Sequence, residues 1–383
     1  MLPYGRQTIE DDDIAAVAEA LKADFLTTGP TVDAFERAFA ETVGARHAVA
    51  CANGTAALHL AMLALDVKPG EVVIAPSITF LATANCARYV GADVVFADVD
   101  PTSGLMTPQT LAQALERVGG RRLRAVLPVH LRGDACDLPG LEALARDAGA
   151  VLVEDAPHAV GTTMRFGNTA EIVGDVRHSA MATFSFHPVK TIATGEGGMV
   201  TTNDPALAAR LKVLRSHGMV RPEGCEPWWY EMPEPGFNYR LPDILCALGL
   251  SQLKKLPRFA ARRRALGAAY AQALAPLARM VRIADQPAWS DPVLHLMVVL
   301  IDFEAAGRTR REVVEALRAR GVGTQVHYIP VHRQPYYRNL YGELDLPGAE
   351  QWYARCLSLP LYPGMEDGDV SKVADALKDV LGL

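Results

Sequence analysis

Short apolar runs alternate with helix-like segments through the first half of the chain, and this alternation is the feature that most restricts its fold. The runs are too short for helices and are apolar throughout, as strands covered on both faces are. Alternation of this kind predicts an α/β protein with a mainly parallel sheet wrapped by helices. The expected strands are residues 48–51, 72–74, 94–96, 125–129, 151–155 and 181–186, with helices expected at 55–65, 81–89, 108–117 and 138–148.

The two ends of the chain follow other patterns. We expect a first helix capped by Thr8, with Asp11 completing a capping box, and a second helix over residues 32–43. Beyond residue 202 a long helical region begins. The segments expected there are helix 242–277 with a break at Pro257, strand 296–301, helix 310–320, strand 324–328 and helix 370–380. We therefore expect a large α/β domain over 1–250, and over 251–383 a linking helix with a smaller α+β domain.

Composition excludes several classes of protein. A chain of 383 residues that is 50% hydrophobic can bury a large core. Its net charge of −6 argues against wholesale nucleic-acid binding, so an anionic substrate needs a local basic pocket. The six cysteines form no CxxC pair, the N-terminus has no apolar signal core, and no segment reaches the length of a membrane span. These features predict a cytoplasmic protein with no membrane partner.

A lysine follows one expected strand in a short, stiff turn. The sequence SFHPVK at 185–190 ends in Lys190, and the glycines of GEGG at 195–198 let backbone pass close to a bulky group. Most such lysines are simply solvated. Asp155 strengthens the reactive interpretation, because it ends another strand and ligands bind beyond the carboxyl ends of parallel strands. A Schiff-base lysine and an aspartate for a ring nitrogen are what a protein supplies to pyridoxal 5'-phosphate (PLP). Otherwise Asp155 caps a turn and His158 packs locally.

A phosphate site is expected where NGTAAL at 53–58 follows a strand and opens a helix. Free backbone N–H groups and the positive end of the helix dipole meet there. Gly54 permits close approach, and the hydroxyls of Thr55 and Ser185 can add hydrogen bonds. The chain has neither a Gly-x-Gly-x-x-Gly nor a Gly-Lys-Ser/Thr motif, which argues against dinucleotide-binding and P-loop functions.

In combination, these segments resemble the DegT-type sugar aminotransferases, which are fold type I PLP enzymes that aminate nucleotide-linked keto-sugars. The resemblance covers essentially the whole chain. It implies a mainly parallel seven-stranded sheet in the large domain and a smaller α+β C-terminal domain. The matching segments are GTAAL at 54–58, SITF at 77–80, EDA at 154–156 with His158, SFHPVK at 185–190, TGEGG at 194–198, RSHG at 215–218 and GFNYR at 236–240.

The resemblance also implies roles around the cofactor ring. Lys190 resembles the Schiff-base lysine, whose amine, once displaced by an amino donor, acts as general acid and base. Asp155 resembles the carboxylate that keeps the ring nitrogen protonated. Phe80 matches the aromatic residue that stacks on the ring, and His158 matches the polar residue near the ring oxygen.

Phosphate binding and assembly follow from the same resemblance. Thr55, Ala56 and Ser185 match the phosphate ligands of the family. Asn238 matches an asparagine that reaches the phosphate of the neighbouring subunit. The resemblance therefore implies a homodimer with shared active sites.

Finer similarity at 228–232, 237–241, 248–254 and 325–332 points to the pseudaminic acid branch of the family. It implies amino transfer from L-glutamate to C4 of a UDP-linked 2-acetamido-2,6-dideoxy-4-keto-hexose, giving UDP-4-amino-4,6-dideoxy-N-acetyl-β-L-altrosamine. His327, Tyr328 and His332 fall in a stretch that would edge the substrate pocket. Arg132 either contacts the nucleotide phosphates or lies on the surface. No metal is expected at His327 and His332, because no acidic or cysteine ligand accompanies them at suitable spacing.

Other functions stay open at this point. The substrate can be a different nucleotide-linked 3- or 4-keto-sugar, for example of the perosamine type. A PLP lyase, an amino-acid transaminase and a non-catalytic regulatory or binding protein on the same fold are further alternatives. Lys190 argues against the sugar-dehydrating relatives, which carry histidine there, and the intact pair with Asp155 disfavours a non-catalytic role. No helix-turn-helix or basic arm is visible in the sequence.

Overall fold

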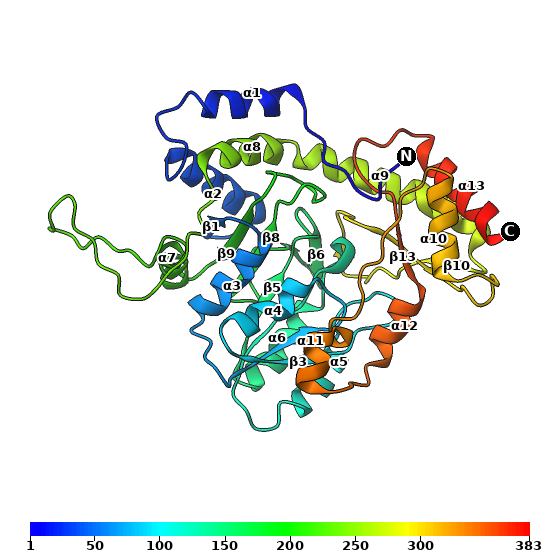
Figure 1. The fold of residues 1–383 in the computed structure, drawn as a ribbon, viewed down its shortest axis with the longest axis horizontal. Coiled ribbons are helices and arrows are strands. Elements are labelled where there is room, and N and C mark those ends of the chain that lie inside the picture. The colour runs from blue at the N-terminus through cyan, green and yellow to red at the C-terminus, as the bar shows by residue number, and fades with distance from the viewer.

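The computed structural model describes all 383 residues, and a seven-stranded sheet flanked by helices forms its centre (Figure 1). The strand order is β1–β9–β8–β5–β4–β2–β3. Strands β8, β5, β4, β2 and β3 are mutually parallel, which confirms the predicted α/β class. The strands are β1 (His47–Cys51), β2 (Val72–Pro76), β3 (Asp93–Ala97), β4 (Leu123–Val126), β5 (Val151–Asp155), β8 (Met181–Ser185) and β9 (Gly198–Thr202).

Strand β9 runs antiparallel to both of its neighbours, β1 and β8. The reason lies in its connection, because a parallel return needs a long crossover, usually a helix. Residues 186–197 between β8 and β9 contain no helix. The same short connection carries Lys190, so the turn that holds the lysine also sets the direction of β9.

Most helices of this part lie close to their expected positions, whereas the helix that follows β9 was not predicted. Helix α4 (Leu81–Tyr89) coincides with the expected segment, and α2, α3, α5 and α6 differ from expectation by one or two residues at their ends. Phe39 packs edge-on against Phe184 of β8, with ring centroids 4.9 Å apart. The other helices are α2 (Pro30–Val43), α3 (Gly54–Ala64), α5 (Pro108–Glu116), α6 (Leu138–Asp147) and α7 (Pro205–Leu214).

Helix α1 (Asp11–Ala20) begins later than predicted, and its capping box is formed by Glu10 and Asp13 instead of Thr8 and Asp11. The Glu10 backbone N–H donates to Asp13 Oδ2 at 2.9 Å. The same oxygen lies 2.7 Å from the ammonium of Lys255. Asp13 is fully buried, so this tertiary contact fixes the helix start.

The long helical region predicted at 242–277 is present, and its side chains contribute to two hydrophobic cores. Helices α8 (Asp243–Lys254) and α9 (Leu256–Leu274) lie end to end along one side of the molecule (Figure 1). The break falls at Lys255, and Pro257 sits in the first turn of α9, where a missing N–H is tolerated. Phe259 of α9 packs in the core of the large sheet, whereas Tyr270 packs in the second core.

The second core lies in the C-terminal part around an antiparallel sheet, β10 (Val281–Ile283), β12 (Met297–Ile301) and β13 (Cys356–Leu359). Helices α10 (Arg310–Ala319) and α13 (Asp369–Leu381) cover it. The N-terminus lies against the same unit, since Leu2 pairs with Val322. The domain boundary at residue 250 stays a prediction. None of the helices combines the length and apolarity that crossing a membrane requires.

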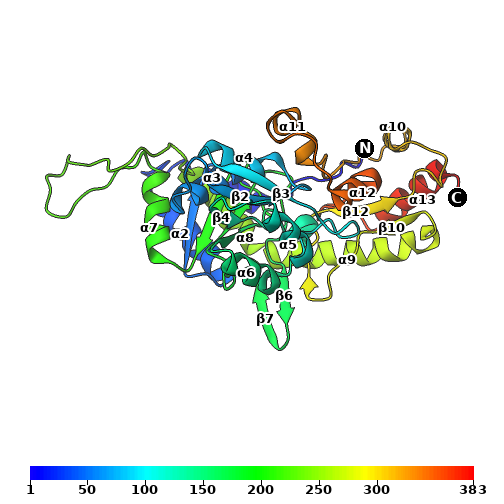
Figure 2. The same cartoon turned by 90° about the horizontal axis from the view of Figure 1, so that it is seen from below.

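The expected strand at 324–328 is wrong. Only Gln325 pairs with a neighbour, Ser358, and the segment is otherwise irregular. Residues 325–328 line a cleft instead of extending a sheet. Several short elements were not predicted; the β6–β7 hairpin projects from the body (Figure 2). They are β6 (Thr163–Phe166), β7 (Thr169–Ile172), β10, β11 (Ser290–Asp291), β13, α11 (Pro335–Tyr341) and α12 (Pro347–Arg355).

Candidate active site

A cleft of about 650 Å³ opens at the carboxyl ends of β5 and β8. Parallel strands deliver their last residues to one edge of the sheet, which is why groups far apart in sequence meet here. The lining includes eight of the residues predicted from the sequence: Thr55, Phe80, Asp155, His158, Ser185, Lys190, His327 and Tyr328.

Lys190 lies in the turn after β8, where its backbone N–H donates to the His187 carbonyl at 2.8 Å. Burial lowers the pKa of the Lys190 amine to about 8, although the negative charge of Asp155 acts in the opposite direction. A lysine with a pKa in this range holds a useful fraction of neutral amine near neutral pH. The neutral amine is the nucleophile that attacks a carbonyl carbon.

Asp155 is the last residue of β5 and is only 5% exposed. Burial raises the pKa of its carboxyl group, while a hydrogen bond from Thr83 and the charge of Lys190 lower it. Thr83 Oγ1 donates to Asp155 Oδ2 at 2.5 Å. Asp155 Oδ1 has no hydrogen-bond partner within the chain, and the residue lines the cleft. A ring nitrogen bound in the cleft can therefore meet an available carboxylate oxygen.

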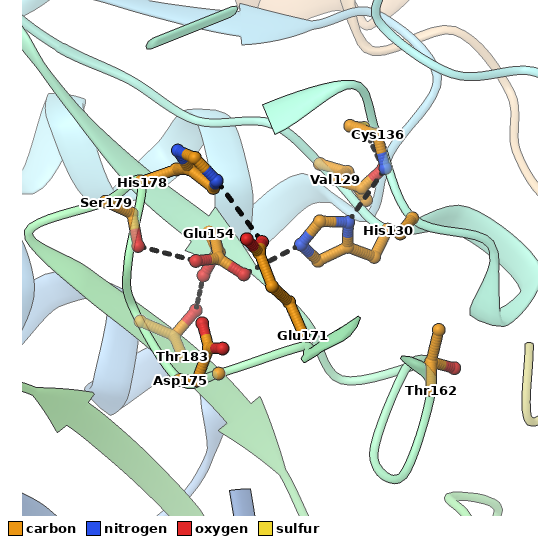
Figure 3. A network of polar contacts seen from close by, with 12 residues as sticks. Val129, His130, Cys136, Glu154, Thr162, Glu171, Asp175, His178, Ser179 and Thr183 are labelled. Carbon is orange, nitrogen blue, oxygen red and sulfur yellow. Dashed lines mark hydrogen bonds and ion pairs between the residues drawn. The ribbon is translucent and has the colours of Figure 1, made fainter. Parts of the chain in front are cut away.

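A buried polar network supports Asp155 from the opposite face of β5 (Figure 3). Neighbouring strand residues point to opposite faces, so Glu154 points away from the cleft side. Glu154 Oε2 lies 2.9 Å from His130 Nε2, and Ser179 Oγ donates to Glu154 Oε1 at 2.5 Å. The Cys136 backbone N–H donates to His130 Nδ1, which places the ring proton on Nε2, facing Glu154. This network fixes the strand end that carries Asp155.

The first turn of α3 and the end of β8 form one wall of the cleft. Helix α3 begins at Gly54, and a Cβ built on this glycine would lie 2.8 Å from the Ser185 Cβ. The positive end of this helix therefore gathers the hydroxyls of Thr55 and Ser185 and the backbone N–H groups of Gly54 and Thr55. Phosphate binding requires donors arranged in this way. The Ala56 N–H already donates to Asn53 Oδ1 at 2.8 Å.

Aromatic and imidazole side chains form the opposite part of the cleft. The His158 ring stacks on His295 with centroids 4.4 Å apart, and His158 Nε2 lies 3.3 Å from the Tyr328 hydroxyl. Burial holds the pKa values of His158 and His295 well below the usual range and lowers that of His327 to about 3. All three rings are therefore neutral near pH 7. His295 was not predicted, because only the path of the C-terminal part brings it here.

Four predicted residues lie outside the lining of this cleft: Arg132, His332, Ala56 and Asn238. Arg132 is only 1% exposed and its guanidinium forms an ion pair with Asp134. This excludes a surface position for Arg132 and leaves its side chain bound inside the protein. His332 is likewise buried, with Nδ1 2.6 Å from Ser77 Oγ.

Comparison with known proteins identifies the family of the chain. The model of the DegT/DnrJ/EryC1/StrS aminotransferase family matches residues 7–378. The chain belongs to this family. SpsC, a spore coat polysaccharide biosynthesis protein of Bacillus subtilis (strain 168), is 40% identical over 392 residues, which cover 99% of this chain and 97% of SpsC. The protein is therefore a sugar aminotransferase that depends on PLP.

Solved structures agree with the fold type I expectation. PseC from Helicobacter pylori, an aminotransferase in the biosynthesis of pseudoaminic acid, superposes with a TM-score of 0.91 at 28% identity, covering 100% of this chain and 99% of PseC. The sugar aminotransferase Spr1654 from Streptococcus pneumoniae in its PLP form gives a TM-score of 0.89 at 25% identity, covering 100% and 98%. The gathered amine, carboxylate and helix N-terminus of this chain fit the aldehyde, the ring nitrogen and the phosphate of PLP, respectively.

Proposed function

We propose that the protein transfers the amino group of L-glutamate to C4 of a nucleotide-linked keto-sugar, with Lys190 and Asp155 as its catalytic residues. The observation that carries this proposal is the convergence of Lys190, Asp155 and the N-terminus of α3 in one cleft. A protein that only bound an amino donor, and did not catalyse its reaction, would have no need for a lysine amine whose pKa is lowered to about 8.

Each side chain then has a defined task. PLP, when bound, supplies the carbonyl that accepts nitrogen and the ring that withdraws electrons. Lys190 Nζ would hold the cofactor and, once released, would take a proton from Cα of glutamate and later deliver a proton to C4 of the sugar. Asp155 Oδ1 would accept the hydrogen bond of the protonated ring nitrogen, and Phe80 would lie against the ring face. Ser185 and Thr55 bind the phosphate together with the helix N–H groups.

His158 and Ala56 have smaller roles in this proposal. The neutral ring of His158 is fixed by its stack on His295 and its contact with Tyr328, and it would lie near the ring oxygen of PLP. The Ala56 backbone N–H is available to phosphate only when Asn53 releases it, because Asn53 Oδ1 accepts it here.

The sugar we propose is the UDP-linked 2-acetamido-2,6-dideoxy-4-keto-hexose of pseudaminic acid-type pathways. The likeness to PseC supports this choice, and His327 and Tyr328 at the edge of the cleft are the residues that would contact the sugar. The higher identity of SpsC, whose name specifies a polysaccharide and no sugar, favours keeping the perosamine-type keto-sugars as the second candidate.

A homodimer with shared active sites forms part of the proposal. The diphosphate of a nucleoside diphosphate-sugar is negatively charged and needs cationic side chains to bind it. The cleft lining of one chain contains no arginine and a single lysine, Lys190. The segment between α7 and α8 projects from the body in both views and carries exposed apolar side chains, including Trp228 at 74% exposure (Figures 1 and 2). An apolar tip of this kind is typical of an interaction site. Asn238 pairs with Ser216 at the base of this segment and is outside its own cleft.

Spectroscopy and turnover test the catalytic part. The PLP-loaded protein should show a visible absorbance band that L-glutamate bleaches and that Lys190→Ala lacks. A panel of UDP- and dTDP-linked 3- and 4-keto-sugars, assayed with glutamate, identifies the acceptor. A wild-type protein that ignores glutamate refutes the aminotransferase proposal, and turnover of dTDP-sugars alone refutes the pseudaminic sugar.

Subunit complementation tests the shared site. Lys190→Ala and Asn238→Ala proteins, each of low activity, are mixed under conditions of subunit exchange. A hybrid dimer contains one site with both native residues, so activity should return on mixing. The control is a mixture of two Lys190→Ala proteins that carry different tags, which should stay inactive because no site contains Lys190. A monomer by light scattering, or no recovery despite exchange, refutes the shared site.

A further inference from the structure

Two buried threonines connect helix α4 to the carboxylate of Asp155. Thr83 lies in the first turn of α4 and is fully buried, and Thr79 precedes that helix and is 2% exposed. Thr83 Oγ1 lies 2.5 Å from Asp155 Oδ2, and Thr79 Oγ1 lies 2.6 Å from Thr83 Oγ1. The three side chains form a continuous line of hydrogen bonds that ends at the cleft.

The direction of these hydrogen bonds follows from the chemistry of the groups. An ionised carboxylate can only accept, so the Thr83 hydroxyl donates its proton to Asp155. The Thr83 oxygen is then left as an acceptor, and the Thr79 hydroxyl donates to it. Both hydroxyl dipoles therefore point toward the negative charge, and each bond strengthens the other in a medium of low dielectric.

Thr83 is the only side chain of the protein that hydrogen-bonds to the Asp155 carboxylate, and no salt bridge reaches it. Burial works against the charged form of this group and raises its pKa, and the hydrogen bond from Thr83 is the largest influence that lowers it again. An O–H···O⁻ bond of 2.5 Å is in the range of strong, charge-assisted hydrogen bonds. The Thr83 hydroxyl thus donates to the buried carboxylate the hydrogen bond that water would donate to an exposed one.

We propose that Thr83, assisted by Thr79, is a positioning residue that binds Asp155 Oδ2 and thereby presents Oδ1 to the ring nitrogen of the cofactor. The carboxylate group turns about its Cβ–Cγ bond. The hydrogen bond from Thr83, which lies in the first turn of a helix, fixes the plane of the carboxylate and therefore the direction in which Oδ1 points. This inference rests on the proposed role of Asp155. Thr83 belongs to no motif in the sequence that would indicate this function.

The decisive variant is Thr83→Val, which has almost the same shape but lacks the hydroxyl. It should weaken PLP binding roughly tenfold to a hundredfold, the range expected for loss of one hydrogen bond to a charge. It should also move the pH midpoint of the visible absorbance of the loaded protein, since Asp155 no longer holds the ring proton as firmly. Thr83→Ser keeps the hydroxyl and should restore both values, and Thr79→Val should change them in the same direction by a smaller factor.

Thr201→Val is the matched control. Thr201 is a fully buried threonine of β9 whose hydroxyl donates to the Gly174 carbonyl at 2.9 Å, outside the cleft. Its loss should lower the urea midpoint without changing the PLP dissociation constant or the absorbance midpoint. Equal spectra and affinities for Thr83→Val and Thr201→Val overturn the proposal, and so does a failure of Thr83→Ser to restore them.

Asp155→Asn separates this inference from the function on which it rests. If Asp155→Asn leaves the spectrum and the PLP affinity unchanged, the proposed role of Asp155 itself is wrong. If Asp155→Asn changes them and Thr83→Val does not, only the positioning by Thr83 is wrong. Urea unfolding of each variant shows whether it is folded, and Thr79→Val provides the second test if Thr83→Val is not.

Discussion

The amine of Lys190 should titrate far below an ordinary lysine in the PLP-free protein. Burial lowers its pKa from 10.5 to about 8. At about pH 7.5 these two values correspond to neutral fractions of about one quarter and about one in a thousand, a ratio of roughly 240. Because only the neutral amine is nucleophilic, Lys190 should react faster, by roughly this ratio, than an equally accessible lysine with the ordinary pKa of 10.5.

Competitive labelling measures this directly. The PLP-free protein is treated briefly with acetic anhydride at a series of values from roughly pH 6 to 10, and mass spectrometry quantifies acetylation of Lys190. The exposed Lys378 in the same digest is the internal reference. In Asp155→Asn the neighbouring negative charge that favours the ammonium is lost, so the pKa of Lys190 should fall further and labelling at neutral pH should increase.

Two results would refute this reasoning. The first is a Lys190 labelling curve that coincides with that of Lys378, which would mean that burial does not act on the amine. The second is an upward movement of the Lys190 midpoint in Asp155→Asn, which would mean that the two groups do not interact as charges.

Three further predictions concern stability and cofactor binding. Burial lowers the pKa of His327 from 6.5 to about 3, so the unfolded chain binds the proton more tightly, and stability falls as pH drops from 6.5 toward 3. At about pH 5.5 this amounts to about 1.4 kcal/mol, and urea unfolding of His327→Gln should show a smaller acid loss. Asp98→Ala removes the buried carboxylate that accepts two backbone N–H groups at the start of α12, and should lower the free energy of unfolding by about 3 kcal/mol. Gly54→Ala forces a Cβ to 2.8 Å from Ser185 Cβ and should weaken PLP binding roughly tenfold in a fluorescence titration.

Matched variants make these tests specific. Asp367→Ala changes a carboxylate that is 94% exposed and should leave the free energy of unfolding nearly unchanged. Gly368→Ala adds a Cβ that meets no atom within 4 Å and should leave PLP binding unchanged. Equal effects in Asp98→Ala and Asp367→Ala, or in Gly54→Ala and Gly368→Ala, would contradict the reasoning from contacts. An equal loss of stability at acid pH in the wild-type protein and in His327→Gln would contradict the reasoning from the pKa of His327.

Much of the cleft could be predicted because it is built on strand ends. Asp155 ends an apolar run and Lys190 follows another, and the carboxyl ends of parallel strands meet by geometry alone. The opening of α3 at Gly54 was equally visible as a turn before a helix. These features are local, so the residues that define them are neighbours in the sequence.

Contacts between distant segments explain what was missed. The residues around Gln325 resemble a strand in isolation, but they pair at a single point and their remaining backbone follows the cleft wall. Arg132 follows a strand end, as a ligand residue would, yet its guanidinium is bound by Asp134 inside the protein. His295 and Thr83 carry no motif of their own, and their roles arise only from what lies beside them.

The sequence by itself determined the layered α/β fold and the placing of Lys190 and Asp155 at one edge of the sheet. Periodic apolar residues and strand-end positions are properties of the local chain, and the sheet converts them into position without further information. Only the tertiary structure decided how those two groups behave. Burial lowers the pKa of Lys190, and Thr83 holds one oxygen of Asp155, because a group's protonation and orientation depend on its whole surroundings, which residues distant in the sequence supply.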